Sequence, residues 1–81
     1  MKLKILFFGI TRDLTDTSEA VLEVKEVSIN LRDLKKILQK KYPNLTDLDM
    51  YAFAVNEEYA NPETVLKDND VVAVIPPVSG G

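Results

Sequence analysis

A run of β-branched residues near the end of the sequence constrains the fold most. Residues 71–75 read Val-Val-Ala-Val-Ile, a continuous apolar run that predicts a central strand buried on both faces. Pro76 and Pro77 end the strand, because proline cannot donate a hydrogen bond to a β-ladder. We therefore expect the last strand of the chain to lie in the middle of a sheet, between strands that precede it in the sequence.

Earlier segments are expected to supply the other strands. Residues 2–8 are rich in β-formers and alternate in polarity, which predicts the first strand. Residues 20–27 predict a second strand, and a hairpin with the first is the simplest pairing. Residues 51–55 predict a third, followed by a turn at 56–57 and a short extended piece at 58–60.

One helix is predicted between these strands. Asn30 matches a helix N-cap with Asp33 three residues later, and Pro43 marks the end of the helix. Residues 10–18 and 44–49 are expected to be turns or loops. An apolar stripe recurs at helical spacing and should face a core: Leu31, Leu34, Ile37 and Leu38.

The order of these elements predicts an α+β fold with a mixed sheet packed on one main helix. This is the β-grasp arrangement of ubiquitin-like proteins, although a different α+β sandwich fits the same pattern. The 81 residues suffice for one domain, which we expect at residues 1–77, followed by a flexible tail at residues 78–81.

The composition argues against several classes of protein. Because the chain has no cysteine and no histidine, a disulfide framework, most soft metal sites and Ser-His or Cys-His nucleophiles are excluded. A net charge of −3 argues against nucleic acid as a partner. The sequence has neither an apolar stretch of about 20 residues nor a secretory signal, so we expect no membrane partner and a cytoplasmic location.

The last residues of the sequence are expected to carry its chemistry. The two prolines favour a stiff, extended exit from the domain, and the four residues beyond them can reach about 13 Å. Gly80 and Gly81 have no Cβ, so they could pass through a narrow channel and present a C-terminal carboxylate to another protein's active site. The alternative is a glycine-ended terminus with no chemical role.

Such a carboxylate suits activation by a partner. Attack on the α-phosphate of ATP gives a mixed anhydride, and a sulfur nucleophile can convert that anhydride into a thiocarboxylate. The chain has no phosphate-binding glycine loop and no plausible Mg²⁺ cluster. We therefore expect a substrate and donor with no active site or bound cofactor of its own, and a partner that uses the ATP.

The end of the chain closely resembles a family signature. Residues 75–81, Ile-Pro-Pro-Val-Ser-Gly-Gly, are similar to the C-terminus of molybdopterin synthase small subunits, a family of ubiquitin-like sulfur carriers. Residues 4–8, 12–14, 54–56 and 66–73 resemble other parts of the same family. One departure is Asn69, where members commonly carry glycine; asparagine also tolerates positive φ.

The resemblance implies a function and a set of partners. An E1-like enzyme would adenylate Gly81, which would become a thiocarboxylate. The tail would then donate sulfur to a pyranopterin precursor in the large catalytic subunit of a heterotetrameric molybdopterin synthase, in molybdenum cofactor biosynthesis. The implied interface with these partners combines an apolar patch near the tail with the tail itself: Phe8, Tyr59, Ile75, Pro76, Pro77, Val78 and Ser79.

Three other functions remain open. A carrier for thiazole formation or tRNA thiolation would use the same tail chemistry, although the Pro-Pro-Val-Ser stretch before Gly-Gly argues against it. A ubiquitin-like modifier would be conjugated to lysine side chains. An adaptor would use the domain alone and leave the tail inert.

Overall fold

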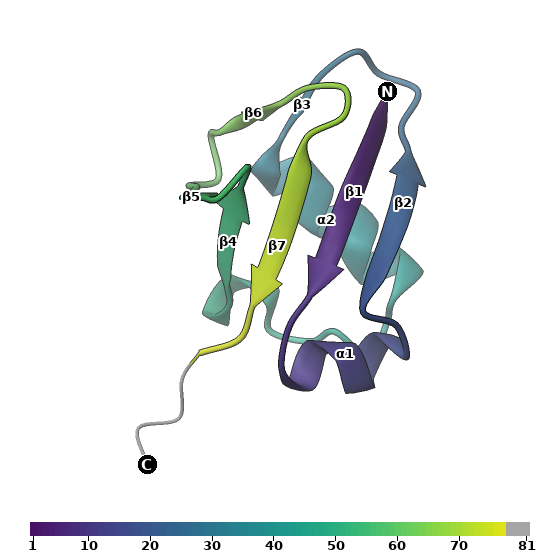
Figure 1. Cartoon of the computed structure of the whole chain (residues 1–81), viewed down its shortest axis with the longest axis vertical. Helices are drawn as coiled ribbons and strands as arrows, with labels where there is room; N and C mark the ends of the chain where they lie inside the picture. Colours follow the sequence, from purple (N-terminus) through teal and green to yellow (C-terminus); the bar gives the residue numbers. More distant parts are fainter. Residues whose placement is uncertain (78–81) are drawn as a thin grey trace.

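The computed structural model describes residues 1–77, which form a five-stranded mixed sheet and a long helix (Figure 1). The strand order is β2-β1-β7-β4-β5. The last long strand, β7, lies in the middle, parallel to β1 and antiparallel to β4, so the predicted central position is confirmed. The five strands are β1 Lys2–Phe7, β2 Glu19–Glu23, β4 Ala52–Val55, β5 Glu58–Tyr59 and β7 Val71–Ile75.

Only one face of the sheet is fully covered, which corrects one expectation for the last strand. Val72 and Val74 on the inner face are completely buried. Val71, Ala73 and Ile75 on the outer face are half-buried, so β7 is not buried on both faces. The run is apolar throughout because its outer face belongs to an exposed apolar surface, described below.

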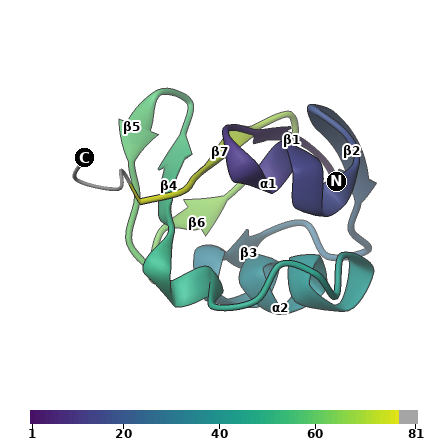
Figure 2. The same ribbon diagram turned by 90° about the horizontal axis from the view of Figure 1, so that it is seen from below.

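The long helix α2, Leu31–Lys41, lies along the inner face of the sheet (Figure 2). Its predicted N-cap is present, because the Asn30 side chain accepts a hydrogen bond of 2.9 Å from the Asp33 amide. Most of the predicted stripe is buried, whereas Ile37 is partly buried at the edge of the core. The helix and the sheet share one core that includes Leu3, Ile5, Phe7, Leu34, Leu38, Phe53, Val72 and Val74.

A short helix, α1 Ile10–Thr15, occupies part of the segment expected to be a turn, so that expectation was wrong. Two buried threonines stabilise it. The Thr11 hydroxyl donates to the Phe8 carbonyl at 2.5 Å, and the Thr15 hydroxyl donates to the Thr11 carbonyl at 2.7 Å. This helix lies at the same end of the sheet as the C-terminal end of β7 (Figure 1).

Several smaller elements differ from the expected pattern. A two-stranded sheet pairs β3, Ile29–Asn30, with β6, Val65–Leu66, and neither strand was predicted. The expected loop at 44–49 leads into a short 3-10 helix, Leu48–Met50. Strand β2 ends at Glu23 rather than at residue 27.

Together these elements form the predicted α+β arrangement, in which a mixed sheet packs on one main helix. The alternative sandwich is not adopted. The predicted tail, residues 78–81, lies outside the described residues.

Candidate functional site

The root of the tail is fixed where β7 ends beside β1. The Phe8 amide donates to the Val74 carbonyl at 3.3 Å, which continues the parallel pairing of the two strands beyond Phe7. Gly9 adopts φ +57, and a Cβ built on it would lie 3.0 Å from Cγ of Pro76. The corner between β1 and α1 therefore packs directly against Pro76.

An apolar surface covers much of the outer face of the sheet next to this root. Leu6 and Ala54 both pair with Ala73 in the strand register, so small and aliphatic side chains share one row across three strands. Residues on this face line a hollow of about 480 Å³, which we call the outer-sheet groove: Leu6, Phe8, Ala54, Asn56, Glu57, Val71 and Ala73. An exposed apolar groove of this kind is typical of a protein interface.

The structure brings some of the predicted interface residues together. Phe8 is 47% exposed in the outer-sheet groove, as its alternation with Lys2 and Lys4 predicts. Ile75, on the neighbouring strand, is half-buried, and Pro76 follows it at the tail root. The partner-binding role of these residues stays a prediction.

Tyr59 lies on the same face of the sheet as the outer-sheet groove, one strand beyond it, because it pairs with Ala54, which lines the groove. It is on β5, beyond β4, and its side chain is 81% exposed. It lines a separate hollow with Val65 and Lys67 among others, although Asn56 lines both hollows. The structure therefore does not place Tyr59 in one hollow with Phe8.

The remaining predicted site residues belong to the tail or directly precede it. Pro77 is exposed and is the last residue that the structure describes. The other tail residues lie outside the described part of the chain: Val78, Ser79, Gly80 and Gly81.

Several residues of the outer-sheet groove were not singled out from the sequence. Leu6 could have been found, because the alternation of residues 2–8 places it on the same face as Phe8. Ala54 and Ala73 could not, because their position in the groove depends on the register between β4 and β7. Glu57 lines the groove only because of the turn between β4 and β5.

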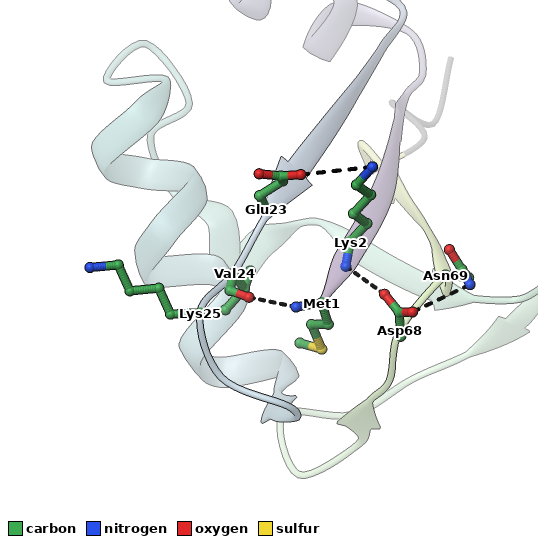
Figure 3. Close-up of a pocket in the computed structure, with 7 residues that line it drawn as sticks. All are labelled: Met1, Lys2, Glu23, Val24, Lys25, Asp68 and Asn69. Atoms are coloured by element: carbon green, nitrogen blue, oxygen red, sulfur yellow. Dashed lines mark hydrogen bonds and ion pairs between the residues drawn. The ribbon is translucent and has the colours of Figure 1, made fainter.

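A second hollow, of about 690 Å³, lies at the end of the sheet opposite the tail root, around the start of β1 (Figure 3). Its polar groups bind one another: the Lys2 amide donates to Asp68 Oδ1 at 2.7 Å, and Lys2 Nζ lies 3.8 Å from Glu23. The Met1 amino group donates to the Val24 carbonyl at 2.6 Å. Because these contacts tie the start of β1 to its neighbours, we interpret this hollow as structural.

Residues 1–77 contain no group of three or more acidic side chains placed to hold a metal ion. No helix in this part of the chain is long and apolar enough to cross a membrane.

The central parallel strand, the single long helix across the sheet and the apolar face at the tail root define a ubiquitin-like β-grasp protein. The chain belongs to the ThiS family, whose model matches residues 5–81.

Known proteins and solved structures are similar to this chain over its whole length. A molybdopterin synthase sulfur carrier subunit from Mycobacterium tuberculosis is 40% identical over 83 residues, which cover 100% of this chain and 99% of that protein. Subunits 1 and 2 of molybdopterin-converting factor from Helicobacter pylori have been solved as a complex. The similar chain in it is 32% identical, with 100% of both chains covered and a TM-score of 0.70. SAMP1 from Haloferax volcanii has the same fold, with a TM-score of 0.88 over 100% of both chains at 20% identity.

Proposed function

We propose that this chain is the sulfur carrier subunit of molybdopterin synthase and that the Gly81 carboxylate is the group that carries sulfur. The observation behind the proposal is its similarity, over the whole chain, to sulfur carrier subunits such as the one from Mycobacterium tuberculosis. The family match also extends to Gly81.

The proposed chemistry takes place at the C-terminus. In the active site of an E1-like enzyme, a carboxylate oxygen of Gly81 attacks the α-phosphate of ATP, and pyrophosphate leaves. A sulfur nucleophile equivalent to hydrosulfide then attacks the acyl carbon and AMP leaves, which gives the thiocarboxylate. The thiocarboxylate sulfur then attacks the pyranopterin precursor and displaces an oxygen leaving group. Water hydrolyses the resulting thioester, which leaves the sulfur on the precursor and restores the carboxylate, so the carrier can be loaded again.

The partners supply the catalysis in this proposal. The sequence has no phosphate-binding glycine loop, and residues 1–77 contain no metal-binding acidic cluster. The chain is then a donor subunit of a heterotetramer with a large catalytic subunit. We also propose a cytoplasmic location, because the activating step consumes ATP.

The outer-sheet groove and the tail root are the proposed docking surface. Phe8, Ile75 and Pro76 lie beside one another there, and Phe8 is a large apolar side chain left exposed. The Helicobacter pylori complex of subunits 1 and 2 supports a two-subunit assembly for this chain. A surface continuous with the tail root could guide Gly80 and Gly81 into the partner's active site.

Reconstituted synthesis tests the proposal. The carrier, an activating enzyme, ATP, a sulfur source and the large subunit are combined with the pyranopterin precursor, and molybdopterin is measured. A variant with one residue other than glycine appended after Gly81 should be inactive. Its terminal carboxylate lies one residue farther from the domain, on a residue that has a side chain. Its melting temperature should equal that of the unmodified chain, because the last core residue in the described part of the chain is Val74, well before the added residue. Normal synthesis by this variant would contradict the proposal.

One alternative is that the same tail delivers sulfur for thiazole formation or tRNA thiolation, a function that the ThiS family match does not separate from the leading proposal. The acceptor distinguishes these functions. If the loaded carrier forms no molybdopterin with the large subunit but supports thiazole synthesis or tRNA thiolation, the alternative replaces the leading proposal. Attachment of Gly81 to lysine side chains of other proteins would instead indicate a modifier.

A further inference from the structure

Glu57 has an unfavourable backbone conformation next to the outer-sheet groove. It follows Asn56 in the two-residue turn between β4 and β5, with φ +73 at Glu57 and +51 at Asn56. Asparagine accepts positive φ readily, whereas a glutamate in this position costs on the order of 1 kcal/mol relative to glycine. Glycine is the usual second residue of such a turn. The glutamate is thus not explained by the folding of the turn.

The turn itself is held firmly against β7. The Asn56 amide donates to the Val71 carbonyl at 2.8 Å, and the Val71 amide donates to Asn56 Oδ1 at 2.9 Å. Asn56 Nδ2 also donates to Asp70 Oδ1 at 2.9 Å. These three bonds hold the backbone of the turn, and with it the backbone of Glu57, in place relative to the central strand.

Within the described part of the chain, Glu57 places the one charged side chain at one end of a mainly apolar groove. It lines the groove together with Leu6, Phe8 and Ala73, and its side chain is exposed. Among residues 1–77, no lysine or arginine forms an ion pair with its carboxylate. Val71 and Ile75 mark the two ends of β7, roughly 13 Å apart, with the turn beside Val71 and the tail leaving after Ile75.

We propose that Glu57 is a specificity-determining residue for docking on the outer-sheet groove, where its carboxylate pairs with a lysine or arginine of the bound large subunit. The apolar groove alone would accept an apolar surface in several orientations. A charge at the end far from the tail selects the orientation in which the partner's cation meets Glu57 and its active site meets the tail. This inference rests on the function proposed above and adds the chemistry of the partner's surface.

The pair should influence orientation and association rate more than total affinity. Charges at the edge of an interface steer the encounter and exclude wrong orientations, and salt screens their effect. We therefore expect loss of the Glu57 charge to weaken binding roughly fivefold at low ionic strength and by less at high ionic strength. A purely steric role for the side chain would show no such dependence on salt.

Three variants test the assignment. Glu57→Gln removes the charge and keeps the shape, whereas Glu57→Gly removes the side chain and the backbone strain. Glu58→Gln is the matched control: Glu58 pairs with Val55 in the register, so its side chain lies on the other side of the sheet from the groove. The equilibrium and rate constants of binding to the large subunit from the same organism are measured by surface plasmon resonance at low and high salt.

Glu57→Gln should weaken binding at low salt, mainly through slower association, with an unchanged melting temperature. Glu57→Gly should weaken binding similarly although its melting temperature rises, and Glu58→Gln should match the wild type. Equal binding of wild type and Glu57→Gln at low salt would overturn the Glu57 assignment and leave the proposed function intact. An equal loss in Glu58→Gln would also overturn it. Failure of the wild-type chain to bind the large subunit would overturn the proposed function and this inference with it.

Discussion

Phe7 and Phe8 show how the alternation of a strand assigns neighbouring residues to different tasks. Phe7 is 1% exposed and contacts the Tyr42 ring edge-on, with ring centroids 5.3 Å apart. Phe8 lies on the opposite face of the sheet and remains half-exposed in the outer-sheet groove. One phenylalanine therefore contributes to the core, and the other is available to a partner.

These two residues give a matched pair of alanine substitutions. Phe7→Ala should lower the free energy of unfolding by about 3–5 kcal/mol, because it leaves a cavity in the core. Phe8→Ala should lower it by only about 1 kcal/mol, because the side chain stays partly in water in the folded state. Urea denaturation measures both changes.

Binding should show the reverse order for the two variants. Phe8→Ala should weaken binding to the large subunit about tenfold, as expected for an aromatic anchor at an interface. Phe7→Ala should bind normally under conditions where it is folded. If Phe8→Ala loses as much stability as Phe7→Ala and binds the partner normally, Phe8 belongs to the core and not to the interface.

Single residues also show where sequence reasoning succeeds. Asn56 and Asn69 were placed in turns, and both adopt positive φ, which asparagine tolerates. The Asn69 amide donates to the Lys2 carbonyl at 2.7 Å, so the turn before β7 is tied to the start of β1. The position of Glu57 in the outer-sheet groove could not be predicted, because it depends on how the β4–β5 turn lies against β7.

At the scale of elements, length decided what the sequence could reveal. Helix α2 has a capping residue and an apolar stripe over eleven residues, and both signals were readable. Helix α1 has only six residues, and two threonines and two charged residues among them are as compatible with a turn as with a helix. Strands β3 and β6 have two residues each and form only because tertiary packing brings them together.

The buried threonines of α1 give the prediction at this scale. The Thr11 side chain is completely buried, and its hydroxyl donates to the carbonyl of Phe8, the residue after β1. Thr11→Val keeps the shape and removes this bond, so it should lower the free energy of unfolding by about 1 kcal/mol. Chemical denaturation measures the loss. Thr17→Val is the control. The Thr17 hydroxyl donates to the exposed Glu19 carbonyl, and water can donate to this carbonyl when the hydroxyl is removed.

An unchanged stability in Thr11→Val would show that the hydroxyl does not hold α1 against β1. A loss in Thr17→Val as large as that in Thr11→Val would show that burial does not set the value of these bonds.

At the scale of the whole molecule, the two ends of the sheet differ in character. One end is tied together by polar contacts around Met1, Lys2 and Asp68 (Figure 3). At the other end, α1 packs beside the tail root, and the outer-sheet groove leads to it. The covered inner face provides stability, and the open outer face is the proposed docking surface. In the proposed function, this division lets a stable domain present its C-terminus to a partner.

The sequence predicted this plan in outline. The apolar run at residues 71–75 placed the last strand in the centre, and the capped stripe of α2 identified the helix that covers it. The groove could not be predicted, because it combines residues of β1, β4 and β7 whose relative positions depend on strand register. The chemistry proposed for Gly81 came from the tail sequence and its resemblance to a family.

The intact mass of the chain tests the central proposal most directly. The chain is incubated with its activating enzyme, ATP and a sulfur source, and its mass is then measured. We predict a gain of about 16 Da, the replacement of one carboxylate oxygen by sulfur, that requires ATP and maps to the C-terminal peptide. An unchanged mass under these conditions, or the same gain in a chain that lacks Gly81, would contradict the account.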